Sequence, residues 1–296
     1  MMTNEQIDKI TQLAKIGLEN GRDYSSLITI KPIKGGSIND AFYVESKDAQ
    51  YFMKFHASAP KQFFKSEANG LRVLKETNTI SVPNYMSYSD QPGNAFLMQE
   101  WIEGKQTEQT EEIFGQKLAA LHRTYGRMHG LETDSYIGLL PQPNELTANW
   151  LDYFRDFRLV SQMKQGEDIG FLKGSRLQKV EKLVERLDEW IPAFAEPSHL
   201  HGDLYAGNWL VGPGGEPYVV DPSFLYGDRH FEIAYTELFD GLPERFYEAY
   251  KESYPLREDY EEIKGIYQLY YLLAHLNIFG ESYGKAIDEI LQHYVG

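Results

Sequence analysis

Apolar residues near the start of the chain recur at the spacing of an amphipathic helix. Within residues 4–18 they are Ile7, Ile10, Leu13, Ala14 and Leu18, which would share one face. Three short apolar or aromatic runs follow at residues 27–33, 41–45 and 51–56, each bounded by polar residues or glycine, and they predict β-strands. The chain is therefore expected to open with a helix laid on a group of strands.

Helical periodicity dominates the remainder of the chain. A helix is predicted over residues 61–77, and residues 95–101 are typical of a buried strand that follows an extended connection at residues 82–85. Residues 125–146 form a long irregular segment, which in a compact domain is often functional. Further helices are predicted within residues 110–122, 147–165, 174–191, 233–238, 244–254, 260–277 and 282–293. His275, within an apolar run of the penultimate helix, is predicted to be a core histidine.

Composition narrows the class of protein. A chain of 296 residues can bury a large core and could form two lobes. It has no cysteine, which excludes disulfides, thiol catalysis and Cys-ligated metals. The formal net charge of −15 argues against a broad surface for nucleic acid or for an anionic membrane. No apolar run is long enough to span a bilayer, and residues 1–17 lack the apolar core of a signal peptide, so the cytoplasm is the expected location.

The candidate chemistry is concentrated in residues 199–223. Asp203 follows His201 and Gly202, Asn208 stands five positions later, and Asp221 ends a short apolar run beyond a Gly/Pro turn. A phosphotransferase needs a carboxylate that orients and deprotonates the attacking hydroxyl. It also needs oxygen ligands for the Mg²⁺ that accompanies ATP, and Asn and Asp supply them. The spacing therefore predicts Asp203 as the catalytic base, with Asn208 and Asp221 as metal ligands.

Each of these pieces also has an ordinary explanation. A His-Gly-Asp sequence is most often a turn, and Asp221 followed by Pro222 is a common strand end. It is the conjunction of all the parts at this spacing that favours a kinase.

A glycine-containing segment between the first two predicted strands is a candidate phosphate-binding loop. It comprises Gly35, Gly36, Ser37, Ile38 and Asn39. The two glycines would let backbone N–H groups approach a phosphate closely. A Gly-Gly hairpin turn explains the same residues at least as well.

Lys54 lies among apolar neighbours in the third predicted strand, where a kinase holds the lysine that contacts the phosphates. The alternative is an edge residue or a snorkelling lysine. Glu67, near the inner face of the helix predicted at 61–77, would be the ion-pair partner of Lys54, although a solvated helix charge is the commoner case. Backbone groups of Glu100, Trp101 and Ile102, near the expected link between lobes, could hydrogen-bond an adenine edge.

Together these parts resemble the fructosamine kinase (ketosamine-3-kinase) family, within the kinase-like folds that include aminoglycoside phosphotransferases and choline kinases. The catalytic-loop pattern is shared with those relatives. The segments more specific to fructosamine kinases are Ile137-Gly138 with Pro141-Gln142-Pro143-Asn144, Tyr226-Gly227-Asp228-Arg229 and Thr236-Glu237-Leu238-Phe239. The chain departs from the usual family pattern with Tyr205-Ala206 in place of Trp-Ser, Ser223 in place of Ala, and Asn149 in place of Asp.

The resemblance implies an α+β, two-lobed protein-kinase-like fold. Residues 1–103 would form a small N-lobe with an antiparallel sheet, and residues 104–296 a mostly helical C-lobe, with ATP and Mg²⁺ between them. It further implies phosphate transfer to a sugar hydroxyl of a small-molecule or protein-bound ketoamine, by analogy the 3-hydroxyl of a fructosamine or ribulosamine, in deglycation. The enzyme would act as a monomer. The residues expected near the acceptor are His201, Tyr205, Tyr226, Asp228 and Arg229.

Two other classes stay open at this point. One is a different small-molecule kinase, acting on an aminoglycoside, choline or a related alcohol, and the family-specific segments argue against it. The other is a non-catalytic, nucleotide-binding interaction protein. Retention of Lys54, Asp203, Asn208 and Asp221 together argues against that class, because a chain that had lost catalysis need not keep all four.

Overall fold

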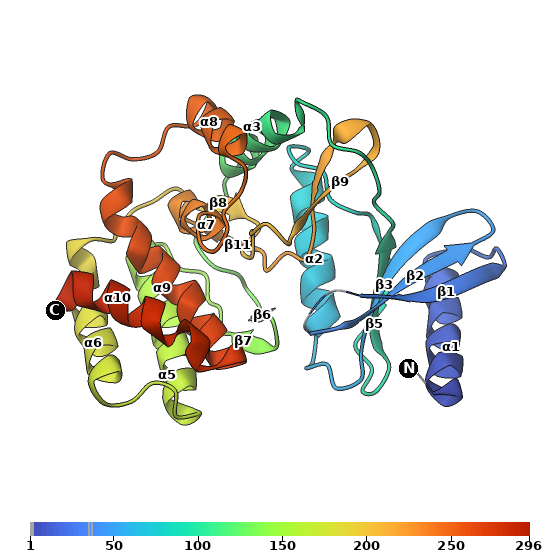
Figure 1. The fold of residues 1–296 in the computed structure, drawn as a ribbon, viewed down its shortest axis with the longest axis horizontal. Coiled ribbons are helices and arrows are strands. Elements are labelled where there is room, and N and C mark those ends of the chain that lie inside the picture. Colours follow the sequence, from blue (N-terminus) through green and yellow to red (C-terminus); the bar gives the residue numbers. More distant parts are fainter. Residues whose placement is uncertain (1–2, 35, 37) are drawn as a thin grey trace.

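The first part of the molecule is a five-stranded antiparallel sheet carried between two helices. The computed structural model describes residues 3–34, 36 and 38–296. The sheet has the order β1-β2-β3-β5-β4, and α1 and α2 lie on opposite faces of it (Figure 1). These elements are α1 (Asn4–Asn20), β1 (Leu27–Ile33), β2 (Asp40–Ser46), β3 (Gln50–His56), α2 (Phe63–Glu76), β4 (Tyr85–Ser89) and β5 (Ala95–Glu100).

The second part is mostly helical, which confirms the predicted α+β architecture with the sheet first and the helices later. Its helices are α3 (Thr110–His122), α4 (Trp150–Tyr153), the π-helix η1 (Phe154–Leu159), α5 (Val160–Asp168), α6 (Gly174–Glu185), α7 (Arg229–Thr236), α8 (Glu244–Ser253), α9 (Tyr260–Phe279) and α10 (Gly284–Val295). Its antiparallel strand pairs are β6 (Ser135–Ile137) with β7 (Leu140–Gln142), β8 (Ser198–Leu200) with β11 (Leu225–Gly227), and β9 (Trp209–Val211) with β10 (Pro217–Val219).

Local sequence explains where the first helix begins and which face it buries. Thr3 and Gln6 form a reciprocal capping box at the start of α1, which satisfies two backbone donors. The apolar stripe packs on the sheet as expected, except that Ile7 is 48% exposed. Ile7 sits in the first turn of α1, before the helix reaches the sheet-facing cluster of Ile10, Leu13, Ala14 and Leu18.

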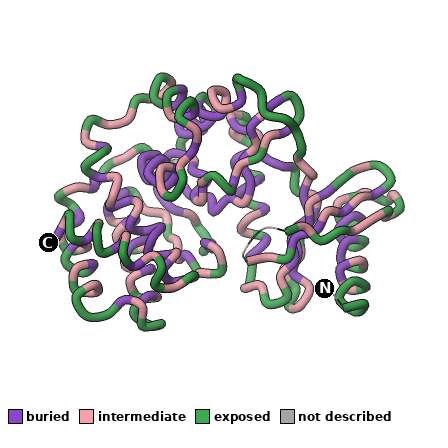
Figure 2. Tube along the Cα trace, viewed as in Figure 1, coloured by how far each residue is buried: buried purple, intermediate pink, exposed green. Residues whose placement is uncertain are grey.

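The buried residues form two hydrophobic clusters. The boundary between these clusters does not coincide with the predicted boundary between the lobes at residue 103. One cluster holds α1 against the outer face of the sheet. The other includes buried residues of α2, β5 and the helical part of the molecule. Figure 2 shows buried segments in both parts. A side chain at Gly70 of α2 would lie 3.1 Å from both Pro222 and Phe224, so α2 packs directly on the segment that follows Asp221. The two lobes therefore share one core.

The structure adds elements that the hydrophobic pattern did not predict. Strand β4 begins at Tyr85, the last residue of the predicted connection 82–85, and the pattern does not predict it because its residues, Tyr-Met-Ser-Tyr-Ser, carry little apolar signal. The irregular segment 125–146 contains the short hairpin of β6 and β7. Helix α7 begins at Arg229, four residues before the predicted start, because the Asp228 side chain accepts a hydrogen bond from the His230 backbone N–H (2.9 Å) and caps it.

The predicted helix 174–191 ends early, since α6 stops at Glu185 and a short 3₁₀ turn spans Leu187–Glu189. Across the described residues, no helix is both long and apolar enough to cross a bilayer.

Replacing Gly115 by alanine is expected to lower the free energy of unfolding by about 1–3 kcal/mol, the usual cost of overpacking. Helix propensity alone would predict a gain of about 1 kcal/mol. Gly115 faces α8, however, where an added Cβ would lie 2.2 Å from the Phe246 carbonyl oxygen. Urea unfolding of Gly115→Ala tests this, with the exposed Gln116→Ala in the same helix as the control. A higher free energy of unfolding for Gly115→Ala than for the wild type would contradict this prediction, because it would show that α3 and α8 can move apart at little cost.

Candidate active site

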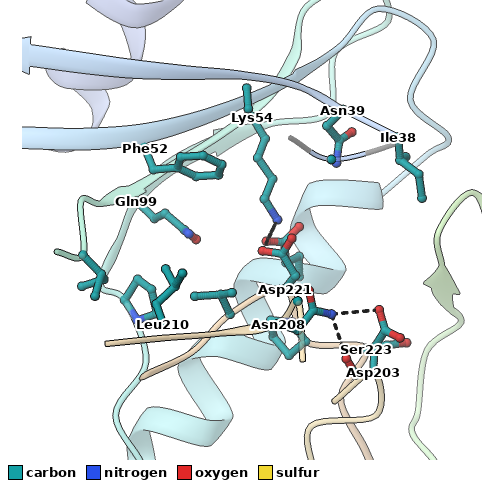
Figure 3. Close-up of a pocket in the computed structure, with 18 of the residues that line it drawn as sticks. Ile38, Asn39, Phe52, Lys54, Gln99, Asp203, Asn208, Leu210, Asp221 and Ser223 are labelled. Atoms are coloured by element: carbon teal, nitrogen blue, oxygen red, sulfur yellow. Dashed lines mark hydrogen bonds and ion pairs between the residues drawn. The ribbon is translucent and has the colours of Figure 1, made fainter. Parts of the chain in front are cut away.

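A cavity of about 610 Å³ lies where the sheet faces the helical lobe. Its walls come from β1, β2, β3, β5, α2 and the segment between β8 and β11, and Figure 3 shows part of them. It brings together most of the residues that the sequence predicted to be functional: Gly36, Ile38, Asn39, Lys54, Glu67, Glu100, Trp101, Ile102, Asp203, Tyr205, Asn208 and Asp221. Two further predicted residues, Gly35 and Ser37, lie outside the described part of the chain.

Lys54 stands at the centre of this cavity and is paired with two carboxylates. It comes from the central strand β3, next to Ala41 and Leu97 on the flanking strands. Its amine lies 2.6 Å from Glu67 Oε1 and 2.5 Å from Asp221 Oδ1. The Lys54 residue is only 4% exposed.

The charge state of this group follows from those contacts. Burial alone would lower the pKa of Lys54, but the carboxylates of Asp221 and Glu67 outweigh it and raise the pKa above the ordinary value. Burial, together with the nearby Asp221, raises the pKa of Glu67, while Lys54 opposes that shift. The amine is thus held in its charged form, in a position to meet an anion that enters the cavity.

Asp221 is held in an unusual backbone conformation. Its φ is +60°, a left-handed value that Asp tolerates better than most residues. The chain reaches it from β10, and the preceding Val220 N–H donates to the Asn208 carbonyl oxygen (3.0 Å). Asp221 therefore lies beside Asn208, and its side chain is 42% exposed, so one carboxylate serves both the lysine and the open cavity.

The loop that carries Asp203 depends on a glycine just before it. Gly202 has φ +84°, and a Cβ there would lie 1.9 Å from the Ser223 carbonyl oxygen, so no other residue fits without moving the loop. Asn208 closes the other side, since its Nδ2 donates to the Asp203 carbonyl oxygen (2.7 Å) and to Asp203 Oδ2 (3.2 Å). The carboxylate of Asp203 is thereby fixed in place (Figure 3).

Burial raises the pKa of Asp203 from 3.8 to about 8. The negative charge of Asp221 adds to this shift, and hydrogen bonds from Tyr235 and Asn208 oppose it. A carboxylate with a pKa near neutrality, at the edge of a cavity, is suited to take a proton from a bound hydroxyl.

Glu232, which sequence reasoning did not single out, holds the loop from behind. Its Oε1 accepts a hydrogen bond from the Gly202 backbone N–H (2.6 Å), and its Oε2 lies 2.9 Å from His122 Nε2. His122 Nδ1 in turn lies 2.8 Å from the Tyr250 hydroxyl. Glu232 and His122 are fully buried. The sequence feature that could have identified Glu232 is a single acidic residue between the apolar residues Phe231 and Ile233.

His201 was expected near the acceptor, but it does not line the cavity. Its ring is completely buried, and Nε2 donates to the Val220 carbonyl oxygen (2.8 Å). Burial lowers its pKa, so the ring is held neutral. His201 instead ties the loop that carries Asp203 to the segment that leads to Asp221.

Tyr226, Asp228 and Arg229 also lie away from the cavity. Asp228 caps α7 and lies 2.6 Å from His230 Nδ1. The Arg229 guanidinium stacks over the Tyr254 ring at 3.7 Å and donates to backbone carbonyls. The family-specific Tyr-Gly-Asp-Arg segment thus builds the start of α7 and lies outside this cavity.

The ring of Tyr226 packs edge-on against His199 and Phe224. His275, predicted to be a core histidine, is only partly buried. Its Nδ1 donates to the Tyr271 carbonyl oxygen (2.8 Å), and its ring lies among those of Phe239, Phe279 and Tyr283.

The link between the lobes, Glu100, Trp101 and Ile102, lines the cavity. The Glu100 and Trp101 N–H groups donate to the Asn84 and Gln50 carbonyl oxygens (2.8 and 3.2 Å), while the Glu100 carboxylate turns to Asn84. Close by, Gln99 also lines the cavity, although sequence reasoning did not select it. The side-chain oxygens of Asn39 and Gln99 are buried and have no hydrogen-bond partner among the described residues.

The donor chemistry of Asn208 and Asp221 fits Mg²⁺, which prefers oxygen ligands. Both hydrogen bonds from the Asn208 amide nitrogen go to Asp203, so its amide oxygen is the atom left for a cation. Within the described residues, no group of three or more His, Cys, Asp or Glu side chains could hold a metal alone. Further ligands would therefore have to come from a bound phosphate or water.

Comparison with known proteins assigns nearly all of the chain to one family. A family model described as fructosamine kinase matches residues 10–296. A protein from Enterococcus faecium named as a ketoamine kinase is 35% identical over 264 residues, which cover 89% of this chain and 94% of that protein. The chloroplastic protein-ribulosamine 3-kinase of Arabidopsis thaliana is 30% identical over 97% of this chain and 84% of its own length.

Solved structures agree with that assignment. A structure from Haemophilus somnus named as a fructosamine-3-kinase superposes with a TM-score of 0.85 at 29% identity, over 97% of each chain. The choline kinase LicA of Streptococcus pneumoniae superposes with a TM-score of 0.63 at 16% identity, over 96% of this chain and all of that one. The second likeness shows the kinase-like fold alone.

Asp203→Asn is expected to raise the free energy of unfolding, by an amount that grows with pH. The folded-state pKa lies near 8 against an ordinary value of 3.8, so ionisation of this carboxyl costs the folded state more than the unfolded one. The wild type should lose stability relative to the variant as the pH rises through that interval, by about 1.4 kcal/mol per unit of pKa difference.

Urea unfolding of both proteins across that pH interval provides the measurement. Asp168→Asn, at the exposed end of α5, serves as the control and should show no such trend. A difference between Asp203→Asn and wild type that does not change with pH would mean that Asp203 titrates as an ordinary surface carboxyl.

Proposed function

Because the chain belongs to the fructosamine kinase family, we propose that it transfers the γ-phosphate of ATP to the sugar 3-hydroxyl of a ketoamine. The observation that carries this proposal is the meeting of Lys54, Asp203, Asn208 and Asp221 in one cavity. A chain without catalysis would have no need to keep a buried lysine, a base of raised pKa and two oxygen ligands together. Phosphorylation at that hydroxyl would make the adduct prone to spontaneous loss, so the proposed role is deglycation.

The chemistry assigned to this chain's own residues is a single in-line transfer. Asp203 would accept the hydroxyl proton while the sugar oxygen attacks the γ-phosphorus. The new O–P bond forms as the bond from the γ-phosphorus to the bridging oxygen breaks, and ADP leaves. A pKa of about 8 suits Asp203 to this transfer near neutral pH.

The remaining residues would bind and orient the nucleotide. Lys54, steadied by Glu67 at 2.6 Å, would hold the phosphates. Mg²⁺, when bound, would neutralise phosphate charge, and Asn208 and Asp221 would hold it. Gly36, Ile38 and Asn39, which line the cavity, would lie over the phosphates.

The acceptor would enter from the side of Tyr205, which lines the cavity close to Asp203. Its ring folds back over the loop, because a side chain at Gly207 would lie 2.6 Å from Tyr205 Cε2. Behind it stands Tyr235, with ring centroids 6.1 Å apart. We expect a free or protein-bound fructosamine or ribulosamine as the acceptor, and a monomeric cytoplasmic enzyme.

Phosphate transfer from ATP should occur with a fructosamine or a ribulosamine, and not with an aminoglycoside or choline. Asp203→Asn should lower turnover by about 10²–10⁴, the usual contribution of a positioned base, while leaving ATP binding nearly intact. A radiolabelled-phosphate transfer assay over the four acceptors makes the measurement. Good activity on the aminoglycoside or choline alone, or a variant as active as wild type, would contradict the proposal.

Tyr205→Trp is expected to change acceptor preference and to leave the apparent affinity for ATP little altered. The family usually has Trp here, and the smaller Tyr ring covers less of a sugar face while adding a hydroxyl. A shift of about 1 kcal/mol in relative kcat/KM is reasonable for a changed aromatic contact. The ratio of kcat/KM for a fructosamine and a ribulosamine, at saturating ATP, is compared between the two proteins. Equal ratios would remove Tyr205 from the acceptor site.

A further inference from the structure

Gln99 is a polar residue placed in an apolar part of the cavity wall. It belongs to β5, where it pairs with Phe52 of β3 and Tyr85 of β4, and it follows four buried apolar residues, 95–98. Only 3% of Gln99 is exposed, yet it lines the cavity. Figure 3 shows its side chain pointing into that space, on the side away from Asn39.

The side-chain oxygen of Gln99 has no hydrogen-bond partner in the part of the chain that the structure describes. This atom, Oε1, is fully enclosed. Buried amides are nearly always hydrogen-bonded, because the loss of water contacts is otherwise uncompensated. An amide oxygen left without a partner by the described residues is one that a bound molecule could satisfy.

The surroundings of Gln99 indicate the shape and chemistry of that partner. The apolar side chains of Ile33, Ala41, Phe52, Leu210 and Val220 line the same cavity. Next along the chain is the link of Glu100, Trp101 and Ile102, which lines the cavity as well. A flat, apolar ring with polar atoms on one edge fits such walls.

The charged residues of the cavity indicate which end of a bound nucleotide would lie near Gln99. Lys54, Asn208 and Asp221 supply the charges that phosphates and their cation require, and Figure 3 shows them clustered apart from Gln99 and Leu210. With the phosphates at that cluster, the base would lie at the Gln99 side.

We propose that Gln99 reads the base of the nucleotide, with its amide oxygen accepting a hydrogen bond from the 6-amino group of adenine. This inference rests on the proposed function, because it takes ATP as the nucleotide. Backbone groups of the link could contact the same edge of adenine, and an amino group has two hydrogens to donate. Gln99 would then be a residue that sets base specificity, and its buried oxygen would be satisfied only when ATP is bound.

The test compares ATP with purine riboside triphosphate, which has hydrogen in place of the 6-amino group. Dissociation constants are measured by calorimetry with Mg²⁺ and without an acceptor, on wild type and on Gln99→Met. Methionine keeps the length and volume of the side chain and removes the acceptor atom. The preference for ATP over the analogue should fall about three- to tenfold in Gln99→Met, the range expected for one hydrogen bond.

Two further variants make the result specific. Gln99→Asn keeps an amide but withdraws it by one methylene group, so it should show the same loss and serves if Gln99→Met does not fold. Gln50→Met, at an exposed position of β3 whose backbone meets Trp101, should keep the wild-type preference.

Equal losses for ATP and the analogue in the Gln99 variants would overturn the inference, because the amide would then not contact the 6-amino group. Failure of the wild type to bind any purine triphosphate would have a different meaning. It would remove the proposed function, and this inference with it.

Discussion

The buried amine of Lys54 is the constraint on which the relation between the two lobes depends. It projects from the centre of the sheet, while its partners Glu67 and Asp221 come from α2 and from the segment beyond β10. A lysine this deeply buried is tolerated because two carboxylates pair with it, and loss of either would leave charge uncompensated in the interior. The placement of the lobes and the electrostatics of the cavity are therefore set by the same three side chains.

The site residues that could be predicted from the sequence are those whose chemistry requires particular residue types at a particular spacing. Asp203, Asn208 and Asp221 were expected to meet because a loop followed by two short strands returns the chain to its starting point, and the structure places them so. Lys54 and Glu67 were expected to pair across a strand and a helix, and their atoms lie 2.6 Å apart. Helices with clear periodicity were predicted to within a few residues at most of their ends.

Residues whose roles depend on neighbours from elsewhere in the fold could not be predicted in this way. Glu232 contacts Gly202, thirty positions away, and nothing in the local sequence of α7 indicates that its carboxylate turns toward the loop. The sequence marks Gln99 only as a polar residue after four apolar residues of β5, which does not indicate that it lines a cavity. Conversely, Asp228 and Arg229 belong to a family-specific segment, yet they stabilise the start of α7. A family motif alone does not distinguish a residue that contacts substrate from one that shapes the scaffold.

The core that α2 shares with the helical lobe bears on how the molecule loses its structure. Helix α2 is covalently part of the sheet lobe, but its buried face belongs to the same cluster as α3, α7 and α9. Neither lobe could melt alone without uncovering apolar surface of the other. We therefore expect heat or denaturant to unfold the chain in one cooperative transition, with coincident loss of sheet and helix signals, rather than in the two steps common among two-domain proteins of this size.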